Sequence, residues 1–511
     1  MKIFSYCFSF FIFCIPFSVW AYNGVDKQKN VVRVSVATLP SFLSPYAKEP
    51  LHDEYSHLFF DTLIRWDTKH KLENRLIKKW KNTEEGVYRF YLKKHVLFHS
   101  GNGLSSKDVI WSFLQMKKSG RNQYLLNKIS HISVINNTTF DIHSKLPQKS
   151  LFDLLTHLFI LDSRFYKQYK ISANTKVKLI NEQAKRLRLP LSGTGPFKIE
   201  RFNVNLNMKV SKNPQYWAKS PIQFEFNFIL IKSSQLRVLA LLSNDVAISE
   251  SISDDFISMI KRSDQHENIQ TVMTRSYILT VSPNHGSSLL KTAEDRKFFQ
   301  LALNQKGMVK HLLYNAGTAG FYFSDMGNDN LVALTPLDIR YAPKQAMRYF
   351  QKSDQEKVMT LLVLNNTLTN MQKTITAITN MLSRVGIHLN TDIVENEKEW
   401  FAKKYSYDLA LNLWQTNLVD FENIYQDLFE KSHFSPLLLE KMEIPPNKDY
   451  VEQAFNLFSM LQLEGYLLPL FSQHERWAGD KIYNFSDIFS VNGIPYWEKL
   501  REKEITKSKK S

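Results

Sequence analysis

Residues that could carry catalysis or hold a metal are few and scattered in this 511-residue sequence. His52 and His57 lie five positions apart, so they do not share a helix face as the i, i+4 pair of a zinc site does. The glycines of residues 193–195 are not followed by the Gly-Lys-Ser/Thr of a phosphate-binding loop, and we expect them to serve a tight turn. No G-x-S-x-G nucleophile elbow is present. These patterns favour a protein that binds a ligand without transforming it, with no enzymatic activity, no metal site and no cofactor.

The residues best suited to bind a ligand lie in and around the segment QTNLVDFEN, residues 415–423. This segment offers the carboxylates of Asp420 and Glu422 and directly follows Trp414, and Trp400 lies shortly before the same region. Flat aromatic rings suit binding sites because they bury a large area with little loss of side-chain entropy. The alternatives are a fully solvated loop for the two acidic residues and an ordinary place in the core for the two tryptophans.

Periodicity predicts the elements that would position this segment. A short apolar run at residues 358–364, a helical pattern at 371–385 and an alternating run at 387–394 predict a parallel strand–helix–strand unit. A third strand is predicted at residues 407–414, and alternating valines predict another at residues 31–37. In open α/β sheets ligands collect outside the carboxyl ends of the strands. The loop after residue 414 is therefore expected to lie at a binding edge.

The first 21 residues have the pattern of a cleavable signal peptide. A basic start is followed by an apolar run at residues 3–17 and by small residues up to Ala21, and the run is short for a membrane span of about 20 residues. Cys7 and Cys14 are the only cysteines, and a bulky residue precedes each, which argues against a lipoprotein anchor. We therefore expect a periplasmic protein of a Gram-negative cell whose mature chain contains no cysteine and no disulfide.

Length and charge exclude other classes of protein. About 490 residues after cleavage are too many for one hydrophobic core and predict two or three lobes. The net charge of +17 could indicate nucleic-acid binding, but the lysines are scattered among acidic residues, and the only concentrated basic run is the tail at residues 507–510. We expect a solvated basic surface and no nucleic-acid partner.

Two longer stretches resemble the motifs of one family. Residues 193–197 (GTGPF) lead through a strand to residues 213–217 (NPQYW), and residues 98–109 (FHSGNGLSSKDV) open a helix. Both are similar to motifs of the extracytoplasmic solute-binding proteins of ABC transporters, solute-binding family 5, the branch that carries peptides, nickel chelates and related solutes. The resemblance continues through segments such as residues 60–67 and 295–316, and covers the chain from about residue 31 to 500. We expect the strand pair and helix around residues 98–109 to be structural and to touch no ligand.

The resemblance implies an α/β fold, the two-lobed periplasmic binding protein fold of type II, cluster C, with an extra subdomain. Lobe I would be discontinuous, and the lobes would close around a ligand by a hinge motion because contacts from both lobes favour the shut state. The implied boundaries are residues 22–60, 190–275 and 472–511 for lobe I, 61–189 for the inserted subdomain and 276–471 for lobe II.

The resemblance also sharpens the site. In peptide-binding members a strand of the pattern YDM-x-LxGW ends in tryptophan, and an aspartate three residues later holds the amino terminus of the peptide. Trp414 matches this tryptophan, Asn417 stands at the position of the aspartate, and Asp420 matches a later acidic position. An amide in place of the carboxylate would weaken recognition of a buried α-amine by roughly 2–5 kcal/mol. Trp400 matches a pocket tryptophan with a shorter spacer, Phe471 lies in a segment similar to the family's late xPLF strand, and we expect both to contact ligand.

We therefore predict the periplasmic substrate-binding component of an ABC transporter, which captures a peptide or peptide-like solute and delivers it to a permease in the inner membrane. We expect it to act as a monomer. One alternative is a ligand sensor or sequestering binder that serves no transporter, and another is a binder of a non-peptide solute such as a metal chelate or haem, although the 14 histidines do not cluster at ligand spacing. A periplasmic hydrolase or chaperone is the third.

Overall fold

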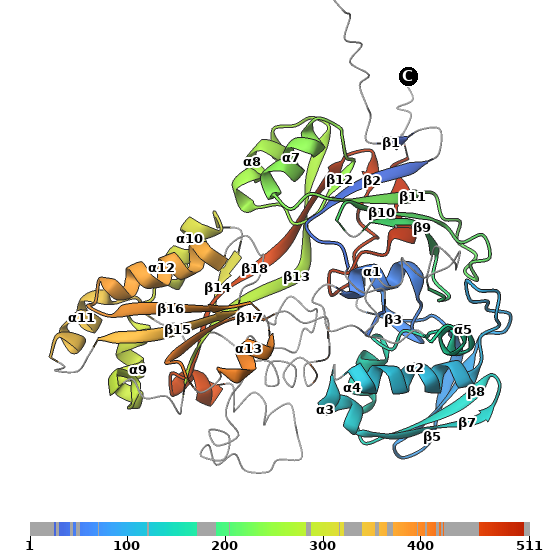
Figure 1. Cartoon of the computed structure of the whole chain (residues 1–511), viewed down its shortest axis with the longest axis horizontal. Helices are drawn as coiled ribbons and strands as arrows, with labels where there is room; N and C mark the ends of the chain where they lie inside the picture. The colour runs from blue at the N-terminus through green and yellow to red at the C-terminus, as the bar shows by residue number, and fades with distance from the viewer. Residues whose placement is uncertain are drawn as a thin grey trace, which may run out of the picture.

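Two large groups of buried apolar side chains organise the chain in the computed structural model (Figure 1). One group joins the expected lobe I to the inserted subdomain, and the other fills the expected lobe II; we keep these names with their predicted boundaries, which stay predictions. The structure describes residues 25–26, 30–40, 44–46, 52–69, 71–119, 122–170, 191–203, 205–282, 288–315, 317–320, 340–352, 357–364, 371–395, 397–403, 406–414, 418, 420, 423 and 459–504.

The described residues include one mixed sheet of twelve strands that extends through both lobes. Its order is β16-β15-β17-β13-β18-β12-β2-β11-β10-β9, with β1 beside β2 and β14 beside β18. The strands are β1 (Val25–Asp26), β2 (Val31–Val36), β9 (Phe197–Asn203), β10 (Asn207–Lys212), β11 (Glu225–Leu230), β12 (Ile248–Ser249), β13 (His266–Val281), β14 (Gly317–Ala319), β15 (Val358–Leu364), β16 (His388–Val394), β17 (Leu409–Trp414) and β18 (Leu467–Asp480). The predicted strand at residues 31–37 is confirmed as β2, an inner strand of this sheet.

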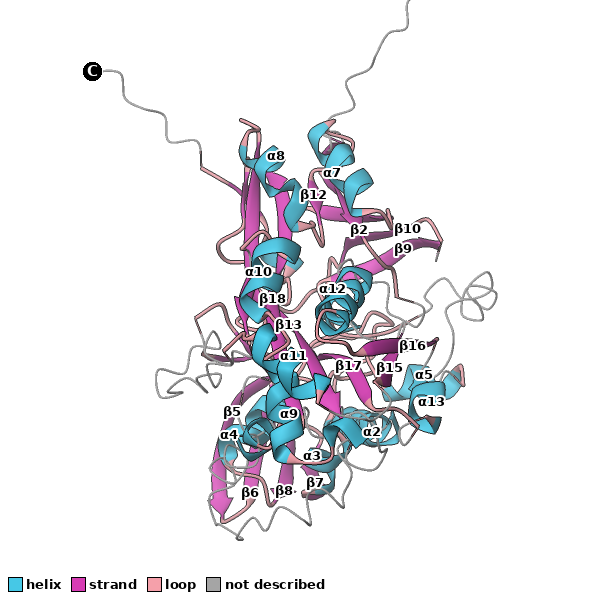
Figure 2. Ribbon diagram, turned by 90° about the vertical axis from the view of Figure 1, so that its left-hand side faces the viewer, coloured by secondary structure: helices cyan, strands magenta, loops and turns pink. Residues whose placement is uncertain are grey.

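Strands β13 and β18 connect the two lobes. They pair antiparallel from His266 with Asp480 to Thr280 with Leu467, and the register shifts between residues 270 and 274 and again after Tyr277. At one end β18 pairs with β12 of lobe I, and at the other end β13 pairs with β17 of lobe II. Both views show the two strands running from the region of α7 (Ser234–Leu242) to the strands of lobe II (Figures 1 and 2). Two adjacent strands shared by two bodies can act as a hinge, because a small change at a few residues reorients everything beyond them.

The strand–helix–strand unit predicted in lobe II is confirmed. Helix α12 (Met371–Ser383) follows β15, buries side chains such as Ile375, Ile378 and Leu382 at helical spacing, and ends just before Gly386, whose φ of 87° is the left-handed conformation that favours glycine after a helix. β16 and β17 both pair parallel with β15, one on each side. The carboxyl ends of β15 and β17 therefore point to the same edge of the sheet, as the prediction of a binding edge requires.

The inserted subdomain is built on a separate four-stranded antiparallel sheet of order β5-β6-β8-β7. The helix predicted to open within residues 98–109 is confirmed as α2, which begins at Ser106, and the strand pair β5–β6 precedes it. Asp108 accepts hydrogen bonds from the backbone N–H and the hydroxyl of Ser105, which caps the helix start. The bounds are β3 (Ile64–Trp66), β4 (Leu72–Asn74), β5 (Ile77–Glu84), β6 (Val87–Leu92), β7 (Ile129–Asn136), β8 (Thr139–Ser144), α2 (Ser106–Ser119), α3 (Gln123–Asn127), α4 (Gln148–Leu155) and α5 (Ser163–Gln168).

The remaining helices, strands and 3-10 turns are short. They are α1 (His52–Phe59), α8 (Ile257–Lys261), α9 (Ala293–Gln300), α10 (Gln305–Leu312), α11 (Pro343–Gln351), α13 (Glu397–Ala402), β19 (Tyr483–Asn484), β20 (Arg501–Glu502) and the 3-10 turns η1 (Asp254–Phe256), η2 (Ser288–Leu290) and η4 (Trp497–Lys499). Within the described part of the chain, no helix has both the length and the apolar character needed to cross a bilayer.

Candidate functional site

Trp414 and Leu418, at the end of β17 and just after it, pack into the large core that also contains residues of the inserted subdomain. Trp414, the last residue of β17, is 4% exposed, and Leu418 is buried beside the same apolar group, which also contains Leu151 and Phe152 of helix α4. Trp414 therefore lies where the carboxyl end of a lobe II strand meets the inserted subdomain. Its contact with a ligand stays a prediction.

Asp420 and Asn423 make polar contacts with helix α4. The hydroxyl of Ser150 donates to Asp420 Oδ2 at 2.7 Å, and Lys149 Nζ lies 3.6 Å from Oδ1. Asn423 Nδ2 donates to the carbonyl oxygen of Ser150 at 2.9 Å. We call this set, together with the bonds to Asp153 described next, the Asp420–α4 contact. It joins the predicted ligand loop of lobe II to a helix of the inserted subdomain.

Asp153 is the centre of the Asp420–α4 contact. Its side chain is fully buried, and its carboxylate accepts hydrogen bonds from the backbone N–H of Asp420 at 3.0 Å, from Asn423 Nδ2 at 2.9 Å and from the indole N–H of Trp66 at 2.8 Å. Buried carboxylates are tolerated when donors surround them in this way. The side-chain oxygen of Asn423, in contrast, is buried and has no hydrogen-bond partner. An N–H group of a ligand would satisfy it.

Two other residues predicted to contact ligand lie in apolar cores. Trp400 of α13 is 4% exposed and stacks on Tyr407 with ring centroids 6.5 Å apart, in a small cluster with residues of β15 and β17. Phe471 of β18 is fully buried in the lobe II core and stacks on Tyr277 at 4.5 Å. Asn417 lies outside the described residues. The ligand contacts of these three residues stay predictions.

A second polar contact links the lobes beside the connecting strands. Lys373 Nζ of α12 lies 3.1 Å from Asp255 Oδ2 of η1 in lobe I. Both side chains are partly exposed, so this ion pair contributes at most about 1 kcal/mol. This pair joins lobe II to lobe I, whereas the Asp420–α4 contact joins lobe II to the inserted subdomain.

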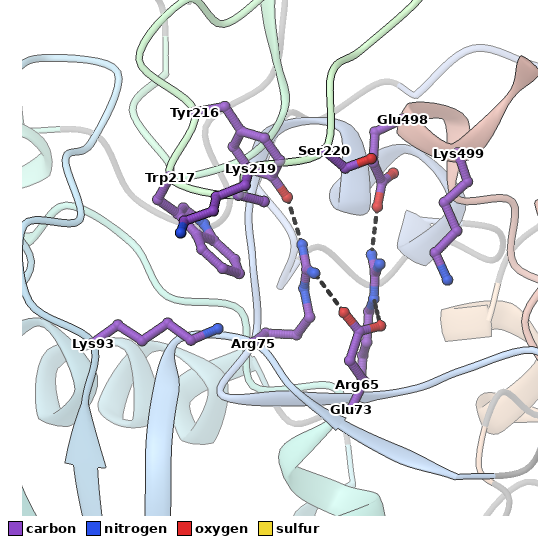
Figure 3. A pocket seen from close by; sticks show the side chains of 11 residues that line it. Arg65, Glu73, Arg75, Lys93, Tyr216, Trp217, Lys219, Ser220, Glu498 and Lys499 are labelled. Carbon is purple, nitrogen blue, oxygen red and sulfur yellow. Dashed lines mark hydrogen bonds and ion pairs between the residues drawn. The ribbon is translucent and has the colours of Figure 1, made fainter.

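Chains of ion pairs connect the hairpin β3–β4 to the end of the chain (Figure 3). Glu73 accepts a hydrogen bond from Arg65 at 3.1 Å with one carboxylate oxygen and one from Arg75 at 2.7 Å with the other. Arg65 also donates to Glu498 at 2.7 Å. Burial opposes ionisation of Glu73, but the two guanidinium groups outweigh it and lower the pKa of Glu73 to about 2. The inserted subdomain is thereby fixed to lobe I.

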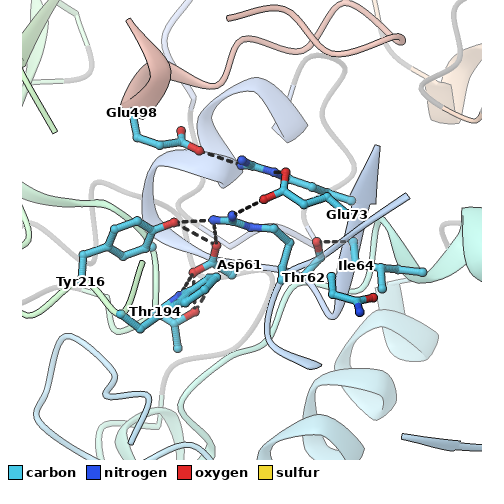
Figure 4. A network of polar contacts seen from close by, with 12 residues as sticks. Asp61, Thr62, Ile64, Glu73, Thr194, Tyr216 and Glu498 are labelled. Carbon is cyan, nitrogen blue, oxygen red and sulfur yellow. Dashed lines mark hydrogen bonds and ion pairs between the residues drawn. The ribbon is translucent and has the colours of Figure 1, made fainter. Parts of the chain in front are cut away.

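The residues of the motifs converge on Asp61, as Figure 4 shows for Thr194 and Tyr216. The Asp61 carboxylate accepts hydrogen bonds from the hydroxyl of Thr194 at 3.0 Å, from the indole N–H of Trp217 at 2.8 Å and from Arg75 at 2.9 Å. Tyr216 lies 3.3 Å from the same carboxylate. The GTGPF and NPQYW segments are therefore structural here, because they tie lobe I to the start of the inserted subdomain.

His99 joins the two motif stretches to each other. Its Nε2 lies 3.0 Å from the carbonyl oxygen of Gly195, and its backbone N–H donates to the carbonyl of Gly193 at 2.8 Å. Burial, with a smaller effect of Lys198, lowers the pKa of His99 to about 4, although the bond to Gly195 acts in the opposite direction. His99 is therefore a neutral structural residue at physiological pH.

The glycines at 193 and 195 are needed for close packing, and the expected tight turn is not the reason for them. A Cβ on Gly193 would lie 2.0 Å from the carbonyl oxygen of Phe59, and one on Gly195 would lie 2.3 Å from the carbonyl carbon of Phe59. Neither glycine has a positive φ. The backbone at the end of α1 therefore leaves no room for a side chain at either position.

The sequence placed Asn423 in the candidate loop. It did not indicate that Ser150 and Asp153 contact this loop, or that Trp66 donates to Asp153. The contact between Ser150 and Asp420 joins residues 270 positions apart, and nothing in the local pattern of α4 indicates it. No group of three or more His, Cys, Asp or Glu side chains that could hold a metal ion occurs among the described residues.

Comparison with known proteins identifies the family of this chain. Residues 71–436 match the family of bacterial extracellular solute-binding proteins, family 5 (middle region). The chain is 20% identical over 305 residues to the oligopeptide-binding protein AppA of Bacillus subtilis, covering 57% of this chain and 53% of that protein. It is 22% identical over 312 residues to the dipeptide-binding protein of Escherichia coli, covering 55% of each. The matched region thus spans about half the length of these relatives.

Solved structures extend the likeness to the whole fold. The periplasmic binding protein DppA of Helicobacter pylori in complex with the peptide STSA superposes with a TM-score of 0.75 at 17% identity, covering 94% of this chain and 99% of that one. NikA of Brucella suis in complex with Fe(III)-EDTA gives the same TM-score and identity, covering 92% and 99%. The predicted α/β, two-lobed periplasmic binding protein fold is confirmed. The chain belongs to the bacterial extracellular solute-binding proteins of family 5.

Proposed function

We propose that this protein is the periplasmic receptor of an ABC transporter for peptides or a peptide-like solute. Its ligand would bind between lobe II and the rest of the molecule, and closure would present the loaded form to a membrane permease. The observation that carries the proposal is the Asp420–α4 contact, which brings the carboxyl end of β17 against the inserted subdomain. Curated relatives named as oligopeptide- and dipeptide-binding proteins support the ligand class.

The ligand would lie near Trp414 and Asn423. The indole of Trp414 would supply an apolar wall, and the unpartnered side-chain oxygen of Asn423 would accept an N–H group of the ligand. A buried acceptor without a partner costs about 1–3 kcal/mol, and a ligand that satisfies it recovers that free energy. Asn417, Trp400 and Phe471 remain proposed contacts on the strength of the family resemblance.

The remaining parts of the proposal rest on the sequence pattern of the first 21 residues, on the scattered charge and on the family resemblance. The protein would be secreted by a signal peptide ending at Ala21 into the periplasm of a Gram-negative cell, and would act as a monomer without nucleic acid. Hinge closure requires no covalent chemistry, so we propose no catalytic activity.

A second ligand class is favoured by one specific observation. Asn417 stands where the resemblance implies the amine-binding aspartate, and NikA bound to Fe(III)-EDTA shares this fold with the peptide binders. A non-peptide solute, such as a metal chelate, would not need an amine-binding carboxylate. This alternative keeps the transport role and changes only the cargo.

The decisive experiment is mass spectrometry of the small molecules released when the protein, purified natively from its own cells, is denatured. A ladder of short peptides is the expected result. A single non-peptide compound would replace the peptide proposal with the second ligand class. If no compound is released, small-angle scattering should show closure with added peptides, and profiles unchanged by every peptide would contradict the transport proposal.

A further inference from the structure

A pocket of about 470 Å³ lies between the hairpin β3–β4, the residue that follows β6 and the two segments 216–220 and 498–499 (Figure 3). All its lining residues belong to lobe I or to the inserted subdomain, so it is separate from the proposed cleft against lobe II. Its size is within the range of small-molecule sites. The lining residues are Arg65, Glu73, Arg75, Lys93, Tyr216, Trp217, Ala218, Lys219, Ser220, Glu498 and Lys499.

Two buried guanidinium groups form the wall of this pocket. The side chains of Arg65 and Arg75 are 5% and 6% exposed, and Glu73 bridges them while Glu498 pairs with Arg65. Arg75 Nε is buried and has no hydrogen-bond partner. The guanidinium groups are thus held in place by ion pairs, and Arg75 keeps one donor without a partner.

Three lysines, Lys93, Lys219 and Lys499, add positive charge to the pocket. Lys93 Nζ donates to the neutral carbonyl of Asn74 at 3.2 Å and lies 4.1 Å from the ring of Trp217. Lys499 lies 5.3 Å from the ring of Tyr496. None of these three lysines has an ion pair within 4.0 Å among the described residues. Figure 3 shows Lys93 and Lys499 on opposite sides of the two guanidinium groups.

The pocket therefore carries excess positive charge. Five cations face two lining carboxylates, Glu73 and Glu498, with the carboxylate of Asp61 behind them, which leaves a formal excess of two positive charges. Burial and then the charge of Arg75 lower the pKa of Lys93, and burial and then the charge of Arg65 lower the pKa of Lys499. A bound anion would offset both effects.

We propose that this pocket is a binding site for a small oxyanion, of which phosphate is the best match. A phosphate group carries about −1.5 to −2 charges at pH 7, which balances the excess, and its oxygens accept hydrogen bonds from guanidinium and ammonium donors. Either form of phosphate offers the pocket the same compact group, which carries several oxygens and one or two negative charges. Its source is either free phosphate or a phosphate ester.

The test is calorimetric titration of the full mature protein with sodium phosphate, glycerol 3-phosphate and succinate at constant ionic strength. Saturable binding of phosphate or glycerol 3-phosphate is expected, the stronger of the two identifies the free or the esterified source, and succinate should bind more weakly. Heats that do not saturate for either phosphate compound, or stronger binding of succinate, would overturn the proposal.

A pair of matched variants ties the binding to the pocket. In Lys93→Gln/Lys499→Gln two ammonium groups are removed without touching the Arg–Glu pairs, and the best ligand should bind roughly 10- to 100-fold more weakly, because a hydrogen bond to a charged group contributes about 1.5–3 kcal/mol. In Lys107→Gln/Lys297→Gln the same charge is lost from two exposed positions, and affinity should be unchanged. Equal losses in both variants would mean a general effect of surface charge and would refute the site. Should the pocket variant melt at a lower temperature than the control, the single Lys499→Gln change provides the same comparison. Peptide binding in the cleft is measured separately, so failure of one proposal does not affect the other.

Discussion

Replacing Asp420 by asparagine separates two roles for this carboxylate. The family resemblance matches Asp420 to a later acidic position beside the amine-binding site, whereas the structure places its carboxylate on Ser150 of helix α4. An asparagine keeps the size and one acceptor oxygen, so Ser150 can still donate to it. The substitution therefore removes the charge of the contact with little change in its shape.

The magnitude follows from the contacts of the carboxylate. A hydrogen bond to a charged acceptor contributes about 1.5–3 kcal/mol and one to a neutral acceptor about 0.5–1.5 kcal/mol, so the bond from Ser150 weakens by about 1–1.5 kcal/mol. Lys149 is 55% exposed at a distance of 3.6 Å, and its pair adds less than about 1 kcal/mol. A loss of about 1–2 kcal/mol reduces the ratio of closed to open molecules about 5- to 30-fold.

Affinities for trialanine and N-acetyl-trialanine, measured by calorimetry on both proteins, distinguish the two roles. If Asp420 acts through closure, Asp420→Asn weakens both peptides by the same factor, because the ligand then binds a less populated closed state. If Asp420 instead holds the ammonium group, only trialanine is weakened, by about 2–5 kcal/mol. That selective loss would refute the closure role. Ser150→Ala is the matched control from the other side of the contact, and in the double variant the two losses should not add.

Three further predictions concern stability. His99 has a pKa of about 4 in the folded protein against an ordinary value of 6.5, so folding stability is lost as the pH falls from 6.5 through 4, by up to about 3 kcal/mol. Denaturant unfolding at pH 7 and at pH 4.5 should therefore show a smaller loss of unfolding free energy for His99→Gln than for the parent protein. The same pH dependence in both proteins would contradict this prediction. Gly195→Ala should cost about 3 kcal/mol or more because its Cβ meets the backbone of Phe59, while Gly103→Ala, with nothing within 4 Å, should melt as the parent does. Trp400→Ala should cost about 3–5 kcal/mol of unfolding free energy. If the variant still folds, a loss of peptide affinity would support the ligand contact that the resemblance implies. An unchanged peptide affinity would assign this residue to the core.

Local patterns in the sequence were sufficient for the strand–helix–strand unit of lobe II and for the strand β17. The unit from β15 to β16 was predicted within a few residues because its apolar periodicity and Gly386 are local signals. The binding edge at the end of β17 followed from the same unit. The pairing of β13 with β18 had no such signal, because it joins segments about 200 residues apart and depends on the arrangement of the whole sheet.

The roles of individual motif residues were harder to predict than the family itself. The order of GTGPF and NPQYW identified the family, but the reason for glycine at 193 and 195 is the nearby backbone of α1, which no local pattern reveals. The pair between Arg65 and Glu498 joins residues 433 positions apart. The basic pocket built around this pair was therefore not predicted from the scattered distribution of lysines in the sequence.

The chemistry of the Asp420–α4 contact suits a receptor that must reopen. Asp153 and Asp420 accept hydrogen bonds from neutral donors, namely the hydroxyl of Ser150, the amide of Asn423 and a backbone N–H. The ion pair of Asp420 with Lys149 is 3.6 Å long, and the lysine side chain is 55% exposed, so water can solvate it on opening. Breaking a buried ion pair by removing one partner costs about 3–5 kcal/mol, because a charge is left without compensation. Opening this contact instead returns both carboxylates to water, which solvates them and replaces the lost donors. The contact can therefore favour the closed form without preventing release of the solute to the permease, as the proposed function requires.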